Sequence, residues 1–282
     1  MATISCYHIT PNGTKAHYTT IGNPEGTLIV LLHGLGGSTE TFAPLLPTLH
    51  PETYRLVCVD LEGFGKTPLS SRDTIPIISR YVDDLESLVS SIHGAKETPM
   101  KFILIGHSLG GIIVTQYAAR HPGNVLGLAL LGSGRSIANI PAARERMLGM
   151  AAKVRAQGIT AAADMAAVSN FPPTIEVPPE LRETVRASVM KSDPEGYSRA
   201  CEAMASLDHI DPEYNRITAP TLLLAGSGDV ISPPERSYGI KGLIGDNAWV
   251  TILEGVGHQL ILQDLEGCSR ALVRLFESIE RA

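Results

Sequence analysis

The stretch from Lys101 to Arg120 constrains the fold more than any other part of the chain. It begins as a branched apolar run, turns at Gly106-His107-Ser108-Leu109-Gly110-Gly111 and continues as a helix-like run. A buried strand, a tight glycine turn and a helix in this order predict a nucleophile elbow, in which a serine hydroxyl projects from a strained turn. Glycines on both sides of the serine let strand and helix approach closely. We therefore interpret Ser108 as a catalytic serine.

Apolar runs alternate with amphipathic stretches before and after this elbow. Residues 3–9 and 15–21 predict a hairpin around the turn Pro11-Asn12-Gly13. We expect buried strands at 28–32, 54–59, 102–105, 125–131, 220–226 and 248–253, and helices at 39–49, 77–92, 112–120, 233–240 and 261–280. Strands that alternate with helices predict an α/β fold with a mostly parallel central sheet flanked by helices.

The segment 137–215 departs from this alternation, because it contains no convincing strand. It is rich in Ala, Met and Arg, and proline pairs interrupt it. Four helices are expected there, at about 142–157, 159–169, 179–192 and 194–206. We interpret residues 1–136 and 216–282 as an α/β core and 137–215 as an inserted four-helix cap over the C-terminal edge of the sheet.

Composition excludes several classes of function. The 282 residues carry a formal net charge of −6 without a basic block, so neither nucleic acid nor an anionic membrane surface is an expected partner. The longest apolar runs are too short to cross a bilayer. Four widely spaced cysteines, without C-x-x-C or metal-ligand spacing, are expected to be reduced and mostly buried: Cys6, Cys58, Cys201 and Cys268. This cysteine usage and the lack of a secretory signal favour a cytoplasmic protein.

A serine nucleophile needs a histidine base, and the histidine needs a carboxylate that holds its tautomer. In parallel sheets such groups collect after the carboxyl ends of strands. Asp229 follows the strand at 220–226, His258 follows the strand at 248–253, and the chain order Ser, Asp, His suits this architecture. We therefore expect a triad of Ser108, His258 and Asp229. Alternative acids are Asp60, Asp246 and Glu254, and Asp229 can also be read as an ordinary turn residue.

An oxyanion hole is expected from the backbone N–H groups of Leu109, after the nucleophile, and Leu35, in the glycine-rich loop His33-Gly34-Leu35-Gly36-Gly37. His33 and Gly34 of that loop are expected beside the substrate. His33 and His107 are interpreted as supporting residues, because hydrogen bonds of His33 would order the loop and His107 would point away from the hydroxyl.

The candidate motifs for binding a metal or a cofactor are incomplete. Gly65-Lys66-Thr67 ends like a phosphate-binding loop, but Asp60 occupies the position of its first glycine. Asp208, His209 and Asp211 resemble metal ligands but are more typical of a solvated turn beside Pro212. No metal and no cofactor are expected.

The motifs together resemble those of the α/β-hydrolase superfamily over nearly the whole chain. They comprise His33-Gly34-Leu35-Gly36, Asp60 to Thr67, Gly106 to Gly111, Gly226 to Asp229 and Gly257-His258. Size and cap are similar to those of 3-oxoadipate enol-lactonases and of butenolide hydrolase-receptors, which respond to strigolactone or karrikin. Epoxide hydrolases and haloalkane dehalogenases carry aspartate at the elbow, so Ser108 favours acyl transfer through an acyl-enzyme. The resemblance implies a cofactor-free hydrolase of carboxylic esters or lactones.

Substrate choice is expected to depend on the cap. Met147, Met150, Met165, Met190 and Met204 lie within it, and a methionine-lined pocket would suit a small, largely apolar ester or lactone. Packing between cap helices is an equally good reading of each methionine. Arg135, where the chain enters the cap, is a candidate for contact with a substrate carboxylate. Two other functions stay open: a slow-turnover ligand sensor, and a hydrolase of C–C bonds in diketones or dienoates. The sequence gives no oligomeric state.

Overall fold

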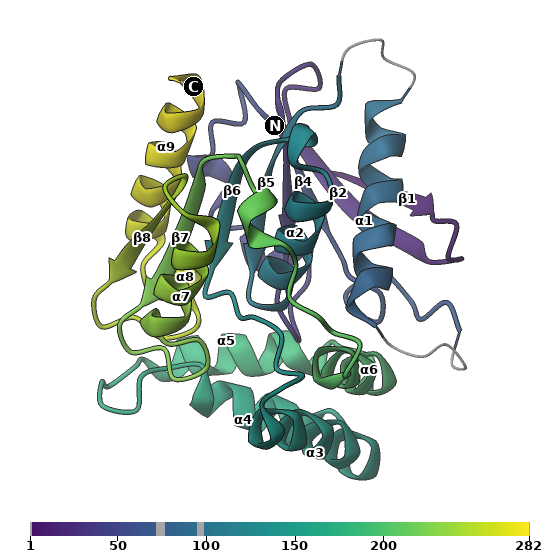
Figure 1. The fold of residues 1–282 in the computed structure, drawn as a ribbon. Coiled ribbons are helices and arrows are strands. Elements are labelled where there is room, and N and C mark those ends of the chain that lie inside the picture. Colours follow the sequence, from purple (N-terminus) through teal and green to yellow (C-terminus); the bar gives the residue numbers. More distant parts are fainter. Residues whose placement is uncertain (1, 72–76, 95–98, 282) are drawn as a thin grey trace.

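The computed structural model describes residues 2–71, 77–94 and 99–281. An eight-stranded sheet forms its centre (Figure 1). In chain order the strands are β1 (Ile4–Ile9), β2 (Lys15–Gly22), β3 (Leu28–Leu32), β4 (Arg55–Val59), β5 (Phe102–His107), β6 (Val125–Leu131), β7 (Thr221–Gly226) and β8 (Ala248–Leu253). Their spatial order is β1-β2-β4-β3-β5-β6-β7-β8, with β2 antiparallel to both β1 and β4 and the remaining neighbours parallel. The expected hairpin and the expected mostly parallel sheet are confirmed.

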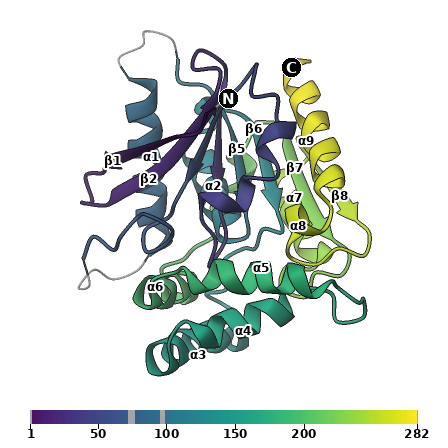
Figure 2. The same ribbon diagram turned by 180° about the vertical axis from the view of Figure 1, so that it is seen from behind.

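Both faces of the sheet are apolar because the parallel strands are apolar at most positions, on both sides of each strand. On β3, Val30 and Leu32 join the core of one face, whereas Ile29 and Leu31 join the core of the other. Helices α1 (Ile78–His93), α2 (Leu109–Arg120) and α7 (Pro234–Ile244) cover the first face, and α8 (Leu260–Gln263) and α9 (Leu265–Glu280) cover the second (Figures 1 and 2). Each fully buried Leu or Ile side chain stabilises this arrangement by roughly 1.5–3 kcal/mol relative to exposure.

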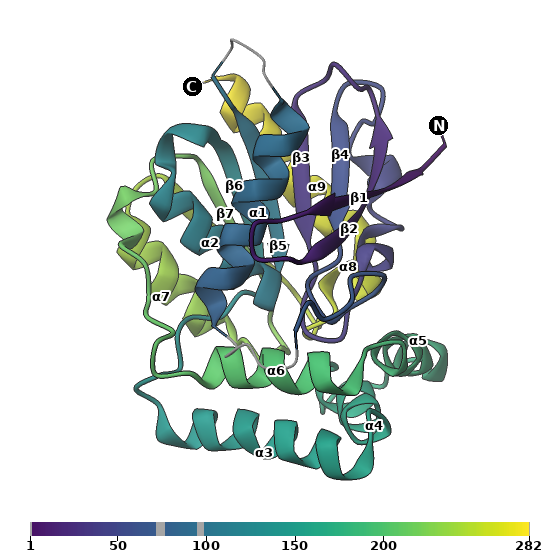
Figure 3. The same cartoon turned by 90° about the vertical axis from the view of Figure 1, so that its right-hand side faces the viewer.

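Four helices lie across the ends of the parallel strands, as Figure 3 shows from the side. They are α3 (Pro141–Gln157), α4 (Thr160–Ser169), α5 (Pro179–Met190) and α6 (Pro194–Ala205). Each begins and ends within two residues of its expected range. Two contacts fix this layer on the loops that follow the strands: Ser188 Oγ donates to the carbonyl of Gly36 at 3.1 Å, and the N–H of His258 donates to the carbonyl of Asn170 at 2.8 Å.

Two of the predicted helices were wrong, because the structure divides each of them into two shorter elements. Residues 39–49 form two short 3₁₀ turns, η1 (Thr39–Phe42) and η2 (Leu46–Thr48), instead of one helix, because Pro44 and Pro47 cannot donate helical hydrogen bonds. The helix expected at 261–280 is divided at Asp264, which leaves the helical conformation (φ −144°, ψ 75°) and caps α9 by accepting from the N–H of Gly267. The helix expected at 233–240 continues four residues further, to Ile244.

All four cysteines are free thiols, and Cys58, Cys201 and Cys268 are buried. Burial raises the pKa of each of these three thiols to about 12, which keeps them protonated and unreactive. None of the helices in the described residues has both the length and the apolar character needed to cross a membrane.

Candidate active site

Ser108 stands at the turn between β5 and α2, in a backbone conformation that few side chains adopt. Its φ is 52° and its ψ is −113°, and among described residues other than glycine only His50 shares a positive φ. Close packing holds the turn: a Cβ on Gly106 would lie 2.5 Å from the carbonyl oxygen of Gly110, and a Cβ on Gly110 would lie 2.1 Å from that of Leu32. The strained turn expected from the sequence is therefore present.

The structure brings Ser108, His258 and Asp229 together from three separate loops. Nε2 of His258 lies 2.9 Å from Oγ of Ser108, and Nδ1 of His258 lies 2.7 Å from Oδ2 of Asp229. All three follow parallel strands, namely β5, β8 and β7, so they meet at one edge of the sheet. This arrangement allows the serine proton to pass to an imidazole that a carboxylate holds in place.

Asp229 is held as an anion in a buried position. Its Oδ1 accepts hydrogen bonds from the backbone N–H groups of Ile231 and Ser232, both at 2.8 Å, which leaves Oδ2 for His258. Burial alone would raise the pKa of Asp229, but His258 and the two backbone donors outweigh it and lower that pKa below its ordinary value. The carboxylate is thus available to stabilise a positive charge on His258.

The glycine-rich loop after β3 lies against the serine. A Cβ on Gly34 would come within 3.0 Å of both Cβ of Ser108 and Nδ1 of His107, so this approach requires glycine. His33 orders the loop, because its Nε2 accepts from the N–H of Leu61 at 3.0 Å and its Nδ1 donates to the carbonyl of Gly34 at 2.7 Å. Burial lowers the pKa of His33, which favours this neutral form. His33 and Gly34 form the back of the loop rather than the wall of the cavity.

Leu35 and Leu109 lie beside the serine at the positions expected for an oxyanion hole. Both line the cavity that contains Ser108. Among the described residues, no hydrogen bond acceptor is found for either backbone N–H. Two free donors next to a nucleophile can bind the charge that develops on a carbonyl oxygen.

A second array of Ser, His and Asp lies near the edge of the sheet that β1 and β2 form. Oγ of Ser5 is 2.8 Å from Nε2 of His17, whose Nδ1 is 2.7 Å from Oδ2 of Asp60. Ser5 belongs to the regular edge strand β1, whereas Asp60 also accepts from the N–H groups of Thr39 and Lys66. This array holds loops together, and it engages Asp60 away from His258. The other alternative acids, Asp246 and Glu254, are exposed.

The serine opens into a cavity of about 320 Å³ between the sheet and the four-helix layer. Of the residues expected to line it, Met147, Met150, Met165 and Arg135 do so, and Met204 joins them. Met190 does not line it and is 38% exposed at the end of α5. Apolar side chains from α3, α4 and α6 thus form much of the wall around the serine.

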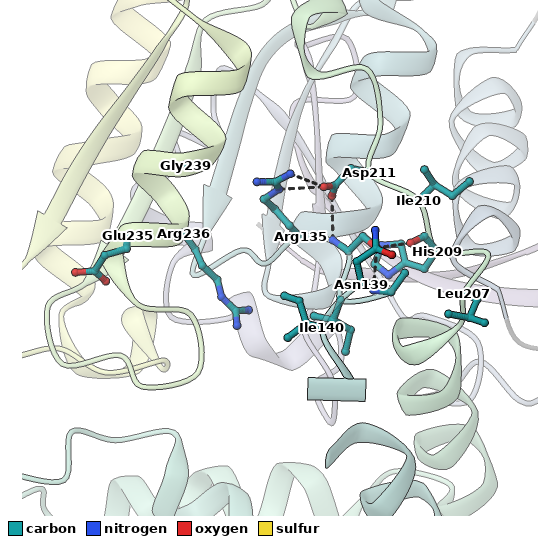
Figure 4. A pocket seen from close by; sticks show the side chains of 13 residues that line it. Arg135, Asn139, Ile140, Leu207, His209, Ile210, Asp211, Glu235, Arg236 and Gly239 are labelled. Carbon is teal, nitrogen blue, oxygen red and sulfur yellow. Dashed lines mark hydrogen bonds and ion pairs between the residues drawn. The ribbon is translucent and has the colours of Figure 1, made fainter. Parts of the chain in front are cut away.

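A second, more open cavity of about 610 Å³ adjoins the first (Figure 4). Arg135, Ile137, His209 and Arg236 line both. The guanidinium of Arg135 is engaged by Asp211, with 3.1 Å between Nε and Oδ2, so its expected contact with substrate has a competitor. Asp211 also accepts from the N–H of Ser136. The polar triplet around His209 therefore forms structural contacts, and no group of described side chains has the arrangement of a metal site.

Sequence reasoning missed four residues that lie around the site. The backbone donors of Ile231 and Ser232 follow Asp229 in an Asp turn, a signal that was present in the sequence. Arg236, seven residues after Asp229, carries no motif. Asn170, whose carbonyl holds the histidine loop, depends on how the helical layer folds back, which no local pattern indicates.

Comparison with protein families agrees with this geometry. Residues 23–265 match the family described as "Serine aminopeptidase, S33". The chain belongs to this family. It is thereby a member of the α/β-hydrolase superfamily of serine hydrolases, which confirms the resemblance expected from the motifs.

Among curated relatives, the putative carbamate hydrolase RutD of Stutzerimonas stutzeri is 29% identical over 91% of this chain and 95% of its own length. The 3-oxoadipate enol-lactonase 2 of Acinetobacter baylyi is 25% identical over 79% of each chain. Among solved structures, a thermophilic esterase from Thermogutta terrifontis superposes with a TM-score of 0.84 at 22% identity, over 99% of each chain. That likeness establishes the α/β-hydrolase fold.

Proposed function

We propose that the chain hydrolyses a carboxylic ester or lactone, with Ser108 as nucleophile, His258 as base and Asp229 as the orienting acid. One observation carries this proposal: the chain of 2.9 Å and 2.7 Å contacts from Oγ of Ser108 through His258 to Asp229, beside a largely apolar cavity. Relatives that include an enol-lactonase support it. Residues 1–136 and 216–282 would act as the core, and 137–215 as a cap over the substrate.

In the first half of the reaction, Oγ of Ser108 attacks the carbonyl carbon while Nε2 of His258 takes its proton. The carbonyl electrons move to oxygen, where the N–H groups of Leu35 and Leu109 receive the charge. The tetrahedral intermediate then collapses and the C–O bond to the alcohol breaks. The alkoxide leaves with the proton from His258, and an acyl-enzyme stays on Ser108.

In the second half, His258 takes a proton from water, whose oxygen attacks the acyl carbon. The carboxylic acid leaves, and the proton returns to Ser108. A lactone follows the same steps, with alcohol and acid as parts of one product. Each step uses only side chains, backbone N–H groups and water, so the proposal needs no cofactor.

The test is hydrolysis of 4-nitrophenyl butyrate by the wild-type protein and by Ser108→Ala. Loss of the nucleophile should lower kcat by about a millionfold while thermal unfolding stays unchanged. Ser5→Ala is a matched control, because Ser5 occupies the same type of hydrogen-bonded array without a strained turn. A fluorophosphonate should label Ser108 and leave Ser5 unlabelled.

Unchanged turnover in Ser108→Ala would refute this function. Single turnover followed by a stable adduct would favour the slow sensor, and preference for a β-diketone over esters would favour C–C hydrolysis. The location in the cytoplasm stays a prediction from the free cysteines.

A further inference from the structure

The charged side chains that line the cavity beside Ser108 are all arginines, although the buried Asp229 lies behind His258 and Asp211 pairs with Arg135. The described side chains that line the 320 Å³ cavity include Arg135, Arg146 and Arg236, and none of them is Asp or Glu. The chain as a whole has a net charge of −6, so this concentration of arginine opposes the average charge. A cavity with low-dielectric walls strengthens the field of such groups at its centre.

The three arginines differ in what they bind. Arg135 is occupied by Asp211, and Arg146 is exposed on α3. Arg236 is only partly exposed, and no hydrogen bond or ion pair is found for its guanidinium among the described residues. Arg236 also lies in the first turn of α7, where the helix dipole disfavours a cation. A partly exposed, unpaired cation gains nothing from this end of a helix, and its N–H donors are free to bind an anion in the cavity.

Arg236 lies at the boundary of the two cavities. It lines both, and one guanidinium nitrogen is 3.5 Å from where a Cβ on Gly134 would be. Figure 4 shows its side chain directed from α7 toward Ile140, whereas the adjacent Glu235 points to the opposite side. His209 belongs to the same wall, and its buried Nε2 has no hydrogen-bond partner. Arg236 and His209 Nε2, both without a hydrogen-bond partner among the described residues, thus lie where the cavities meet.

We propose that Arg236 binds a carboxylate on the substrate, at the end remote from the bond that Ser108 attacks. This inference rests on the proposed function and narrows it to half-esters of dicarboxylic acids and to lactones that carry a carboxylate. The planar guanidinium can donate two parallel hydrogen bonds to a carboxylate. The methionine-lined part of the cavity would hold the apolar chain between the two ends.

The test uses 4-nitrophenyl half-esters of dicarboxylic acids from succinate to suberate, each paired with its methyl ester. The two members of a pair differ in charge, and the length series brackets the distance to Arg236. For at least one length, the wild-type kcat/KM should favour the anion, and Arg236→Gln should lower that value about ten- to a hundredfold. The neutral partner should change less than about twofold, and Arg236→Lys should regain part of the loss.

Arg270→Gln is the control, because Arg270 is an exposed arginine on α9 that lines neither cavity. A second measurement separates this inference from the proposed function. Calorimetry on Ser108→Ala, with monomethyl adipate and dimethyl adipate as probes, reports binding without turnover. If monomethyl adipate binds more tightly than dimethyl adipate, and if adding Arg236→Gln removes this difference, the inference is supported even when no ester is hydrolysed. Equal effects of Arg236→Gln on both members of every pair, or no charge preference at any length, would overturn it.

Discussion

His107 donates a hydrogen bond from Nε2 to the backbone carbonyl of His258, over 2.9 Å. The residue before the proposed nucleophile thus holds the loop that carries the proposed base, although 151 positions separate His107 and His258 in the chain. The two imidazole rings lie 5.1 Å apart between centroids. Burial, and then the nearby His258, lower the pKa of His107 to about 4, so this ring is neutral at pH 7.

The first prediction follows from that neutral ring. Between pH 6.5 and pH 4 the unfolded chain binds a proton at this histidine and the folded protein does not, so folding stability must fall as pH falls. The shift corresponds to about 3 kcal/mol of unfolding free energy. Urea unfolding across this pH range should show a shallower loss in His107→Gln, whose amide can still donate to the carbonyl of His258. Identical pH slopes in the two proteins would contradict it.

The second prediction concerns Gly34. A Cβ at this position would lie 3.0 Å from Cβ of Ser108, so Gly34→Ala should push the loop of Leu35 away from the serine. We expect kcat for 4-nitrophenyl butyrate to fall about a hundred- to a thousandfold, as when one oxyanion donor is lost. KM should change little. Gly149→Ala is the control, because a Cβ on Gly149 meets nothing within 4 Å. Equal kcat values for the two variants would remove Leu35 from the proposed oxyanion hole.

The third prediction distinguishes the roles of the two carboxylate oxygens of Asp229. In Asp229→Asn the backbone donors of Ile231 and Ser232 keep an acceptor, but an amide N–H would replace the acceptor that faces His258. The imidazole would then take the wrong tautomer, and kcat should fall by about four orders of magnitude. Thermal unfolding should show a folded protein. The exposed Asp246→Asn should retain wild-type kcat; a similar loss there would point to a general effect of charge.

Local pattern sufficed for the parts of this molecule that depend on periodicity and on turns. The elbow at Ser108 and the strand ends that place Asp229 and His258 could be predicted, because parallel strands bring such residues to one edge. The four-helix segment could be predicted because its helices are bounded by prolines and caps such as Asp193, which accepts from the N–H of Gly196.

Local sequence patterns could not predict contacts between segments that are far apart in the chain. Arg135 was a candidate for contact with a substrate carboxylate because it stands where the chain enters the four-helix segment, yet Asp211, 76 positions later, pairs with it. Met190 was expected in the pocket, but it is the last residue of α5, is 38% exposed and does not line the cavity. The role we infer for Arg236 depends on the absence of a partner, which a linear pattern cannot show. Only packing decides which charges remain unpaired.

The fourth prediction tests the engagement of Arg135. Arg135 precedes the four-helix segment and Asp211 follows it. Their ion pair therefore links the two stretches of chain that connect this segment to the sheet. Asp211 also accepts from the hydroxyl of Tyr214 at 3.1 Å. A double-mutant cycle of Arg135→Ala and Asp211→Ala, measured by urea unfolding, should give a coupling of about 1 kcal/mol, since Arg135 is 40% exposed and partly screened. Arg135→Ala should also lower kcat/KM for anionic and neutral esters by the same factor. Additive stabilities together with a loss confined to the anionic ester would instead make Arg135 the anion-binding residue.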